Sequence, residues 1–102
     1  RVKIVHMKTL GNRYIVKYHP DVIKYDIRKL GSASCQRITT AIEEKLMTRP
    51  ETFGIPLRRS LNGHRKLRVG DYRVVFRIEN EIIIVLAIMH RSSVYMHVQA
   101  RV

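Results

Sequence analysis

The sequence predicts an α+β fold, in which a small antiparallel β-sheet is covered on one face by an N-terminal helical hairpin and is followed by a short C-terminal segment. Apolar side chains recur at helical spacing between residues 20 and 46. Residues 64–90 instead form strand-like runs separated by turn residues. A chain of 102 residues that is 45% hydrophobic suits a single domain with one modest core, and we assign residues 1–102 to it.

The start of the chain is interpreted separately. Because the chain begins at Arg1, Met7 is a candidate natural start, and residues 1–13 are a candidate extension of the domain. The first predicted element of the domain is a short strand from Tyr14 to Tyr18.

Two short helices are predicted next, joined near Gly31 as a helical hairpin. The apolar residues of the first helix are Ile23, Ile27 and Leu30. We expect Ser32 or Ser34 to cap the second helix and Pro50 to mark its end. The apolar stripe of the second helix comprises Cys35, Ile38, Ile42 and Leu46.

Residues 51–63 contain helix breakers and predict a loop that leads into the sheet. The three strands predicted after it are His64–Val69, Tyr72–Glu79 and Glu81–His90. Gly70-Asp71 suits a two-residue hairpin turn, because glycine adopts positive φ angles, and Asn80 marks the second turn. The third strand is apolar on both faces, which predicts a central position in the sheet. Residues 92–102 are predicted as either a short helix or an irregular tail.

The turn at Gly70-Asp71 also predicts which side chains share a face of the sheet. If Val69 pairs with Tyr72, Arg68 opposes Arg73, and directly opposed residues point to the same face. The core face then carries Leu67, Val69, Tyr72, Val74, Phe76 and Ile78. The other face carries His64, Lys66, Arg68, Arg73 and Arg77. Each opposed pair of like charges costs roughly 0.2–1 kcal/mol, so we interpret the second face as a surface that binds a polyanion.

The charge of the whole chain indicates the same class of partner. Twenty Lys and Arg residues against eight Asp and Glu residues give a formal net charge of +12. Nucleic acid is the polyanion we expect first, ahead of an anionic membrane or an acidic protein.

Other residue types indicate the cellular compartment and the cofactors that we expect. A single cysteine, Cys35, excludes an intrachain disulfide and favours a reducing cytoplasm. The longest apolar run, residues 82–89, is far shorter than the ~20 residues that a membrane-spanning helix needs, so we expect no membrane association. The five histidines and the cysteine lack zinc-like spacing, and we expect no metal and no other cofactor.

Two motifs resemble a known family. Residues 56–78, PLRRSLNGHRKLRVGDYRVVFRI, join a basic loop to the hairpin pattern basic-L-basic-x-G-x-Y-R, and residues 90–95 read HRSSVY. With the strand–helix–helix–sheet order, they resemble the RelE/ParE superfamily of toxins from bacterial type II toxin–antitoxin systems over residues 14–101. The resemblance implies a RelE-like fold. Members similar to RelE are endoribonucleases that cut mRNA in the ribosomal decoding site, whereas members similar to ParE poison DNA gyrase.

The resemblance to the RelE branch implies functional residues and partners. The residues that match its catalytic positions are Lys66, Arg73, Arg91 and Tyr95. His64 stands where relatives often have a second lysine. The candidates for RNA binding are Arg68, Arg77, Arg65, Arg58 and Arg59. The implied partners are mRNA in the ribosomal decoding site and a cognate RelB-like antitoxin, which would form a heteromeric complex with this chain.

The chemistry is consistent with these residue types. RNA is cut when its own 2′-hydroxyl attacks the adjacent phosphate, so a protein needs only a base and groups that stabilise the charge. Arginine suits bidentate binding of that phosphate. Lys66 is the first candidate base, because Arg68 and Arg73 nearby favour its neutral form. His64, with an ordinary pKa of about 6.5, is the alternative base, and Tyr95 would orient or stack on a nucleobase.

We therefore expect a ribosome-dependent endoribonuclease toxin that needs no metal. Two alternatives stay open at this point: a ParE-like gyrase poison, and an RNA- or ribosome-binding module without catalysis. The convergent cations favour the first interpretation, because a gyrase poison needs no set of phosphate-binding groups.

Overall fold

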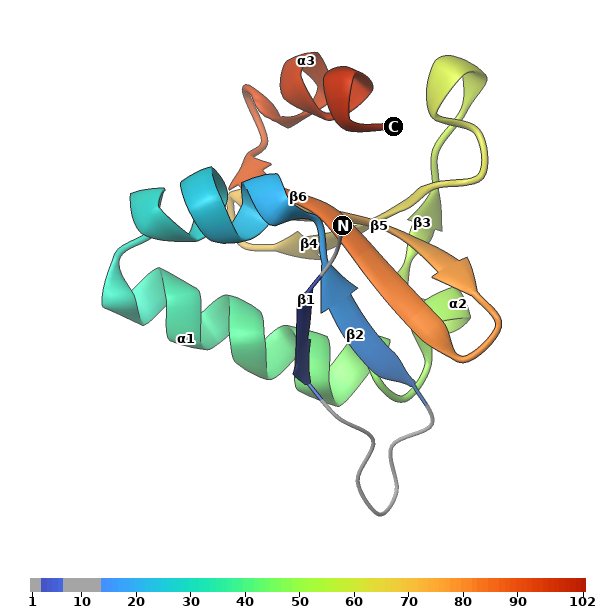
Figure 1. Ribbon diagram of the computed structural model, residues 1–102, viewed down its shortest axis with the longest axis horizontal. Coiled ribbons are helices and arrows are strands. Elements are labelled where there is room, and N and C mark those ends of the chain that lie inside the picture. The colour runs from blue at the N-terminus through green and yellow to red at the C-terminus, as the bar shows by residue number, and fades with distance from the viewer. Residues whose placement is uncertain (1–2, 7–13) are drawn as a thin grey trace.

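A six-stranded sheet with helices on both sides organises the molecule (Figure 1). The computed structural model describes residues 3–6 and 14–102. The strands are β1 (Lys3–His6), β2 (Ile15–Tyr18), β3 (Ile55–Pro56), β4 (Arg65–Val69), β5 (Tyr72–Glu79) and β6 (Ile82–His90), in the spatial order β1-β2-β6-β5-β4-β3. The predicted fold class is confirmed, and so is the central position of β6. Neighbouring strands are antiparallel except β2 and β6, whose parallel pairing the sequence did not indicate. The candidate start at Met7 lies outside the described residues.

The predicted helical hairpin is present. Its first half consists of a π-helical turn, η1 (Val22–Asp26), and a 3-10 turn, η2 (Ile27–Lys29). Its second half is α1 (Ser32–Ala41), which continues as the π-helical segment η3 (Ile42–Leu46). The predicted serine cap is wrong. The chain is already extended at Leu30 and Gly31, so Gly31 takes the N-cap position, Ser32 is the first residue of α1, and no side chain caps this helix.

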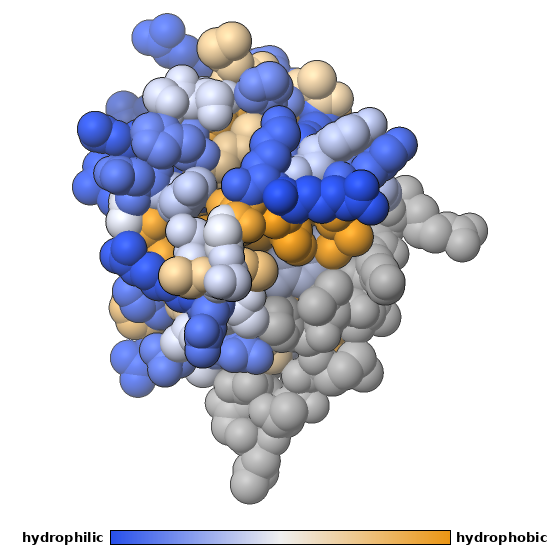
Figure 2. Space-filling view, turned by 90° about the vertical axis from the view of Figure 1, so that its left-hand side faces the viewer, coloured by the Kyte–Doolittle hydropathy of each residue, from blue (hydrophilic) through white to orange (hydrophobic). Residues whose placement is uncertain are grey.

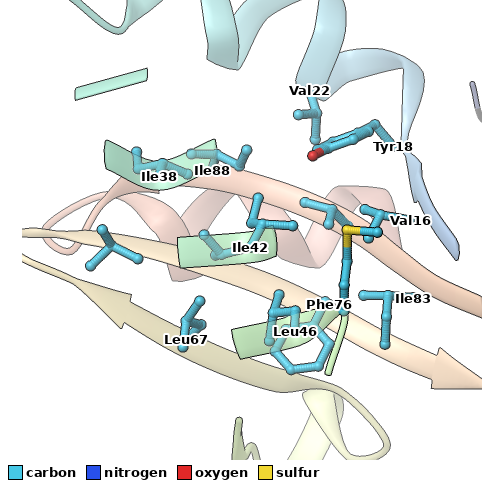
Figure 3. Close-up of a cluster of buried hydrophobic side chains, with 14 of the residues drawn as sticks. Val16, Tyr18, Val22, Ile38, Ile42, Leu46, Leu67, Phe76, Ile83 and Ile88 are labelled. Carbon is cyan, nitrogen blue, oxygen red and sulfur yellow. The ribbon is translucent and has the colours of Figure 1, made fainter. Parts of the chain in front are cut away.

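The main core lies between the helical hairpin and one face of the sheet. Figure 3 shows Ile38, Ile42 and Leu46 packed over the side chains of several strands. The strand residues buried there are Val16, Tyr18, Leu67, Val69, Val74, Phe76, Ile83, Val85 and Ile88. This set contains the fully buried members of the predicted core face, so the predicted pairing of faces is correct for β4 and β5.

The opposite face carries a second, smaller hydrophobic cluster that the sequence analysis missed. Its buried members are Leu61, Val75, Ile84, Leu86, Ala87, Val94 and Val98. A β-bulge where Val75 pairs with Ala87 and Phe76 with Val85 leaves Leu86 as an extra residue, so Leu86 and Ala87 both contribute to this cluster. The cluster is covered by α3 (Val94–Val98), which lies on the other side of the sheet from α1 (Figure 1).

The segment predicted as a loop contains short regular elements. Residues 51–63 include most of helix α2 (Pro50–Phe53), strand β3 and the 3-10 turn η4 (Arg59–Leu61). Strand β3 is possible because its two residues pair with β4 and extend the sheet by one short strand. Among the helices of residues 14–102, none has the length and apolar character required to cross a membrane.

A buried ion pair fixes the C-terminal segment. Arg101, in the 3-10 turn η5 (Gln99–Arg101), donates to both carboxylate oxygens of Asp26 at 2.7 and 2.9 Å. Asp26 also accepts the backbone N–H of Ile88 at 2.9 Å, and Arg101 donates to the carbonyl of Leu86 at 2.9 Å. Three segments distant in sequence, η1, β6 and η5, are therefore tied at one point.

Candidate functional site

The predicted register of the β4–β5 hairpin is confirmed. Val69 pairs with Tyr72, Arg68 with Arg73 and Lys66 with Val75. The turn adopts the backbone that the sequence suggested, because Gly70 has a φ of +60°. Lys66, Arg68 and Arg73 therefore share the face of the sheet opposite α1.

Helix α3 brings Tyr95 to Lys66. The ammonium nitrogen of Lys66 lies 5.7 Å from the centre of the Tyr95 ring, within the range of a cation–π interaction. Val94 and Val98 are buried against the sheet, which leaves Tyr95 partly exposed, at 37% of its surface. Lys66 and Tyr95 lie 29 positions apart in the sequence, and the structure places them together.

Arg73 is held by the turn that precedes it. Its Nη1 donates to the carbonyl oxygens of Gly70 and Tyr72 at 3.0 and 2.9 Å. These bonds use one guanidinium nitrogen and fix the orientation of the group. Within residues 14–102, no carboxylate lies within ion-pair distance of Arg73, so its charge is available to an external anion.

Arg91 lies beside the same turn. Its backbone N–H donates to the carbonyl of Asp71 at 2.8 Å, and its Nε lies 3.9 Å from a carboxylate oxygen of Asp71. The side chain is 63% exposed. An ion pair this exposed contributes little to stability, and the guanidinium is free to exchange Asp71 for a phosphate.

His64 occupies a different environment from Lys66. Neither ring nitrogen of His64 is accessible to solvent, and neither has a hydrogen-bond partner within the described part of the chain. A general base must contact the proton that it removes. In this conformation only Lys66, of the two candidate bases, has that access.

Two of the remaining predicted RNA-binding residues, Arg65 and Arg77, do not form one surface with Lys66. Arg65 lies on the core face, where it donates to the carbonyl of Gly54 at 3.1 Å. Arg77 is separated from Arg73 by the fully buried Val75 and forms an ion pair with Glu79. Arg58 and Arg59 are exposed at the turn η4. The predicted continuous cationic face is therefore divided by the second hydrophobic cluster.

The group that the structure does bring together consists of Lys66, Arg68, Arg73, Arg91 and Tyr95, which we call the hairpin site. Its members come from β4, β5, the end of β6 and α3. It is rich in cations and hydrogen-bond donors. No group of three or more His, Cys, Asp or Glu residues in the described ranges, 3–6 and 14–102, is arranged to hold a metal ion. The hairpin site is chemically suited to bind phosphate.

Comparisons with known proteins place the chain among its relatives. Residues 12–95 match the family model described as the ParE toxin of type II toxin–antitoxin systems, parDE. The chain is 37% identical over 65 residues to toxin RelG of Mycobacterium tuberculosis, a match that covers 58% of this chain and 75% of RelG.

Solved structures show the same fold. The RelBE2 toxin–antitoxin complex of Mycobacterium tuberculosis contains a chain that matches with a TM-score of 0.67 and 28% identity, over 78% of this chain and 99% of that chain. The toxin RelE of E. coli matches with a TM-score of 0.60 and 22% identity, over 89% and 98% of the two chains.

Proposed function

Since this chain belongs to the RelE/ParE superfamily of type II toxins, we propose that it is a metal-independent endoribonuclease that cleaves mRNA in the ribosomal decoding site. The observation that carries this proposal is the convergence of Lys66, Tyr95, Arg68 and Arg73 on one face of a rigid hairpin. The proposal places the protein in the cytoplasm, where translating ribosomes are found.

The hairpin site supplies the groups that the reaction requires. Lys66 takes the proton from the 2′-hydroxyl, the 2′ oxygen attacks the adjacent phosphorus, and the bond from phosphorus to the 5′ oxygen breaks. The 5′ oxygen takes up a proton from solvent as it leaves. Arg73 and Arg68 stabilise the additional negative charge on the phosphate, and preorganised donors of this kind commonly contribute a factor of about 10²–10³ to the rate.

Tyr95 and Arg91 position the RNA in this proposal. The exposed part of the Tyr95 ring offers a surface on which a nucleobase can stack, and stacking on an aromatic residue contributes about 1–3 kcal/mol to binding. Arg91 binds a neighbouring phosphate in exchange for Asp71.

We also propose an inhibitory partner, a cognate RelB-like antitoxin. The solved relatives include toxin–antitoxin complexes from Mycobacterium tuberculosis, Methanococcus jannaschii and E. coli. With a net charge of +12, this chain favours an inhibitor with an acidic segment that covers the hairpin site.

Primer extension on a reporter mRNA tests the proposal. Purified toxin should produce discrete cuts within the reading frame when ribosomes are present and none when they are absent. Ribosome binding without cuts would instead support a non-catalytic RNA-binding module.

The family model favours one second candidate, a gyrase poison, because it is named for ParE. Intact mRNA together with accumulated gyrase–DNA cleavage complexes would support that function and contradict ours.

A further inference from the structure

A pocket lies at the end of the sheet where β5 begins and β6 ends, and α3 forms one of its sides. Its volume is about 360 Å³, and it lies between η1–η2, the ends of β5 and β6, and α3. The residues that give it chemical character are Tyr25, Lys29, Tyr72, His90, Ser93 and His97. Tyr72 and His90 directly precede Arg73 and Arg91 in the sequence. Because consecutive strand residues point to opposite faces, the Tyr72 wall of the pocket and Arg73 of the hairpin site lie on opposite faces at the same end of the sheet.

The buried pair Asp26–Arg101 also lines this pocket and gives it a rigid wall. Both oxygens of the Asp26 carboxylate are bonded to Arg101, and one also accepts the N–H of Ile88. The one acidic group that lines the pocket is therefore paired, although Arg101 also lies 3.6 Å from a carboxylate oxygen of Asp21 and is shared between the two carboxylates.

The remaining polar groups in the pocket differ in how far they are engaged. His90 accepts from the backbone N–H of Ser92 and Ser93 donates to the carbonyl of His90, and the ammonium of Lys24 lies 5.3 Å from the centre of the Tyr25 ring. Lys29 and His97 have no hydrogen-bond or ion-pair partner within residues 14–102, and both are exposed at the pocket. Tyr72 and His90 are in edge-to-face contact, with ring centres 6.0 Å apart, which fixes one aromatic wall. Tyr25, 47% exposed, provides an aromatic ring on the η1 side.

This combination is selective for one class of ligand. Aromatic rings bind the flat face of a nucleobase, and a lysine with a histidine binds a phosphate. The volume lies at the lower end of the range for small-molecule pockets, about 300–1,000 Å³, which suits a single nucleotide.

We propose that this pocket, which we call the α3 pocket, binds one unpaired nucleotide of the RNA, adjacent to the nucleotide whose 2′-hydroxyl reacts in the hairpin site. The RNA backbone would pass from Arg73 and Arg91 over the end of the sheet to Lys29. The proposal rests on the proposed function and names a second point at which the same substrate is held.

Binding of adenosine 5′-monophosphate tests the proposal without ribosomes. The protein used for this measurement carries Arg73→Ala, so that its expression is not toxic to the host cell. The titration with the nucleotide is followed by NMR. The expected result is saturable shifts of the backbone amides around Tyr72, Ser93 and His97. Lys29→Gln and His97→Ala should each weaken binding about tenfold, because each removes one charge-assisted or polar contact to the phosphate. Arg28→Gln removes a neighbouring exposed cation that does not line the pocket, and it should leave the affinity unchanged.

Three results would overturn the proposal. The first is that ribose 5-phosphate or inorganic phosphate binds as tightly as the nucleotide, which would show that the aromatic rings contribute nothing to the affinity. The second is that an acidic peptide binds at these residues and the nucleotide does not, which would assign the pocket to a protein partner. Equal affinity in Lys29→Gln and Arg28→Gln would show that binding occurs elsewhere.

The ribosome assay separates this proposal from the proposed function. With active toxin, Lys29→Gln should raise the ribosome concentration required for half-maximal cleavage about tenfold and leave the rate at saturation unchanged. Nucleotide binding to the pocket in a protein that makes no ribosome-dependent cuts would contradict the proposed function alone. Cleavage by a protein whose pocket binds no nucleotide would contradict this inference alone.

Discussion

The two faces of the sheet carry hydrophobic clusters of different construction. The cluster under α1 draws on β2, β4, β5, β6 and both halves of the helical hairpin, and its centre is fully buried. The cluster under α3 is built on β5, β6, α3 and Leu61 of η4, and it is flanked by Lys66, Arg73 and Arg77. The comparison indicates a division of roles: the α1 face holds the fold together, and the α3 face positions charges.

Removal of a large side chain from the α1 face gives the largest expected effect. Phe76 is fully buried in that core, so Phe76→Ala should lower the free energy of unfolding by about 3–5 kcal/mol. Urea denaturation in the Arg73→Ala background measures this change. Val74→Ala on the α1 face and Val98→Ala on the α3 face remove the same two methyl groups from fully buried sites, and Val98→Ala should cost clearly less, because the smaller cluster can collapse around the lost methyl groups. Equal losses would contradict the division of roles.

The second largest loss of stability is expected when the buried ion pair between Asp26 and Arg101 is broken. Arg101→Met leaves the buried carboxylate of Asp26 without its partner, which should cost about 3–5 kcal/mol. The double variant Asp26→Asn with Arg101→Met removes the stranded charge and should recover much of that loss. Calorimetry of both variants checks this. A double variant as unstable as Arg101→Met alone would show that the packing of the arginine side chain matters, and that its charge does not.

Arg73→Ala should separate activity from stability. Cleavage should slow by about 10²–10³-fold, because the guanidinium is held in place by the turn carbonyls and has no carboxylate partner within residues 14–102. The free energy of unfolding should change by about 1 kcal/mol or less, because the two lost hydrogen bonds are partly solvated. Single-turnover cleavage and thermal melting, measured on the same preparation, test both parts. An active variant would show that the hairpin site is not catalytic.

The pH dependence of cleavage should identify the base. If Lys66 takes the proton, the single-turnover rate should rise with pH, because a general base acts in its unprotonated form. His64→Ala should then leave the shape of the profile unchanged. A profile whose shape changes in His64→Ala would assign the base to His64 instead, and it would require the buried imidazole to become accessible.

Salt dependence gives the smallest expected difference. Affinity for ribosomes should fall steeply with salt concentration, and Arg68→Ala should flatten the logarithmic slope by about one unit. Arg77→Ala is the matched control, because Arg77 is already paired with Glu79 and should change the slope much less. Equal changes would show that both halves of the divided cationic face contact RNA.

The parts of the structure that follow from local pattern were predictable. Helical spacing indicated α1 and η3 with their buried residues Ile38, Ile42 and Leu46, whereas Cys35 of the same predicted stripe is only half-buried. Gly70 fixed the hairpin register that places Arg68 opposite Arg73. The second hydrophobic cluster was not predictable in this way. It depends on a bulge at Leu86, which shifts the alternation of β6, and on a helix too short to show a clear period.

The candidate site, too, was predictable only where its residues are placed by local sequence. Lys66 and Arg73 were placed by the hairpin alone, whereas the contact of Lys66 with Tyr95 depends on how α3 docks. The α3 pocket combines residues from four separate segments, and nothing in their local sequence indicates that they meet. One feature of the sequence did indicate the second cluster. Strand β6 is apolar on both faces, and a strand that is buried on both faces must be covered by other residues on each of them.

The position of β6 has a consequence for the order in which the protein becomes active during its own synthesis. The strand pairs with β2 on one side and β5 on the other, yet it is made after both. Until residue 90 has left the ribosome, the nascent chain can form the β4–β5 hairpin but cannot join it to β2. Tyr95 and Arg101 emerge later still, so Lys66 lacks its aromatic partner and Asp26 its counter-ion while these residues remain in the exit tunnel. At a synthesis rate of about 5–20 residues per second, the β4–β5 hairpin is therefore exposed for a short time before α3 can cover the second hydrophobic cluster.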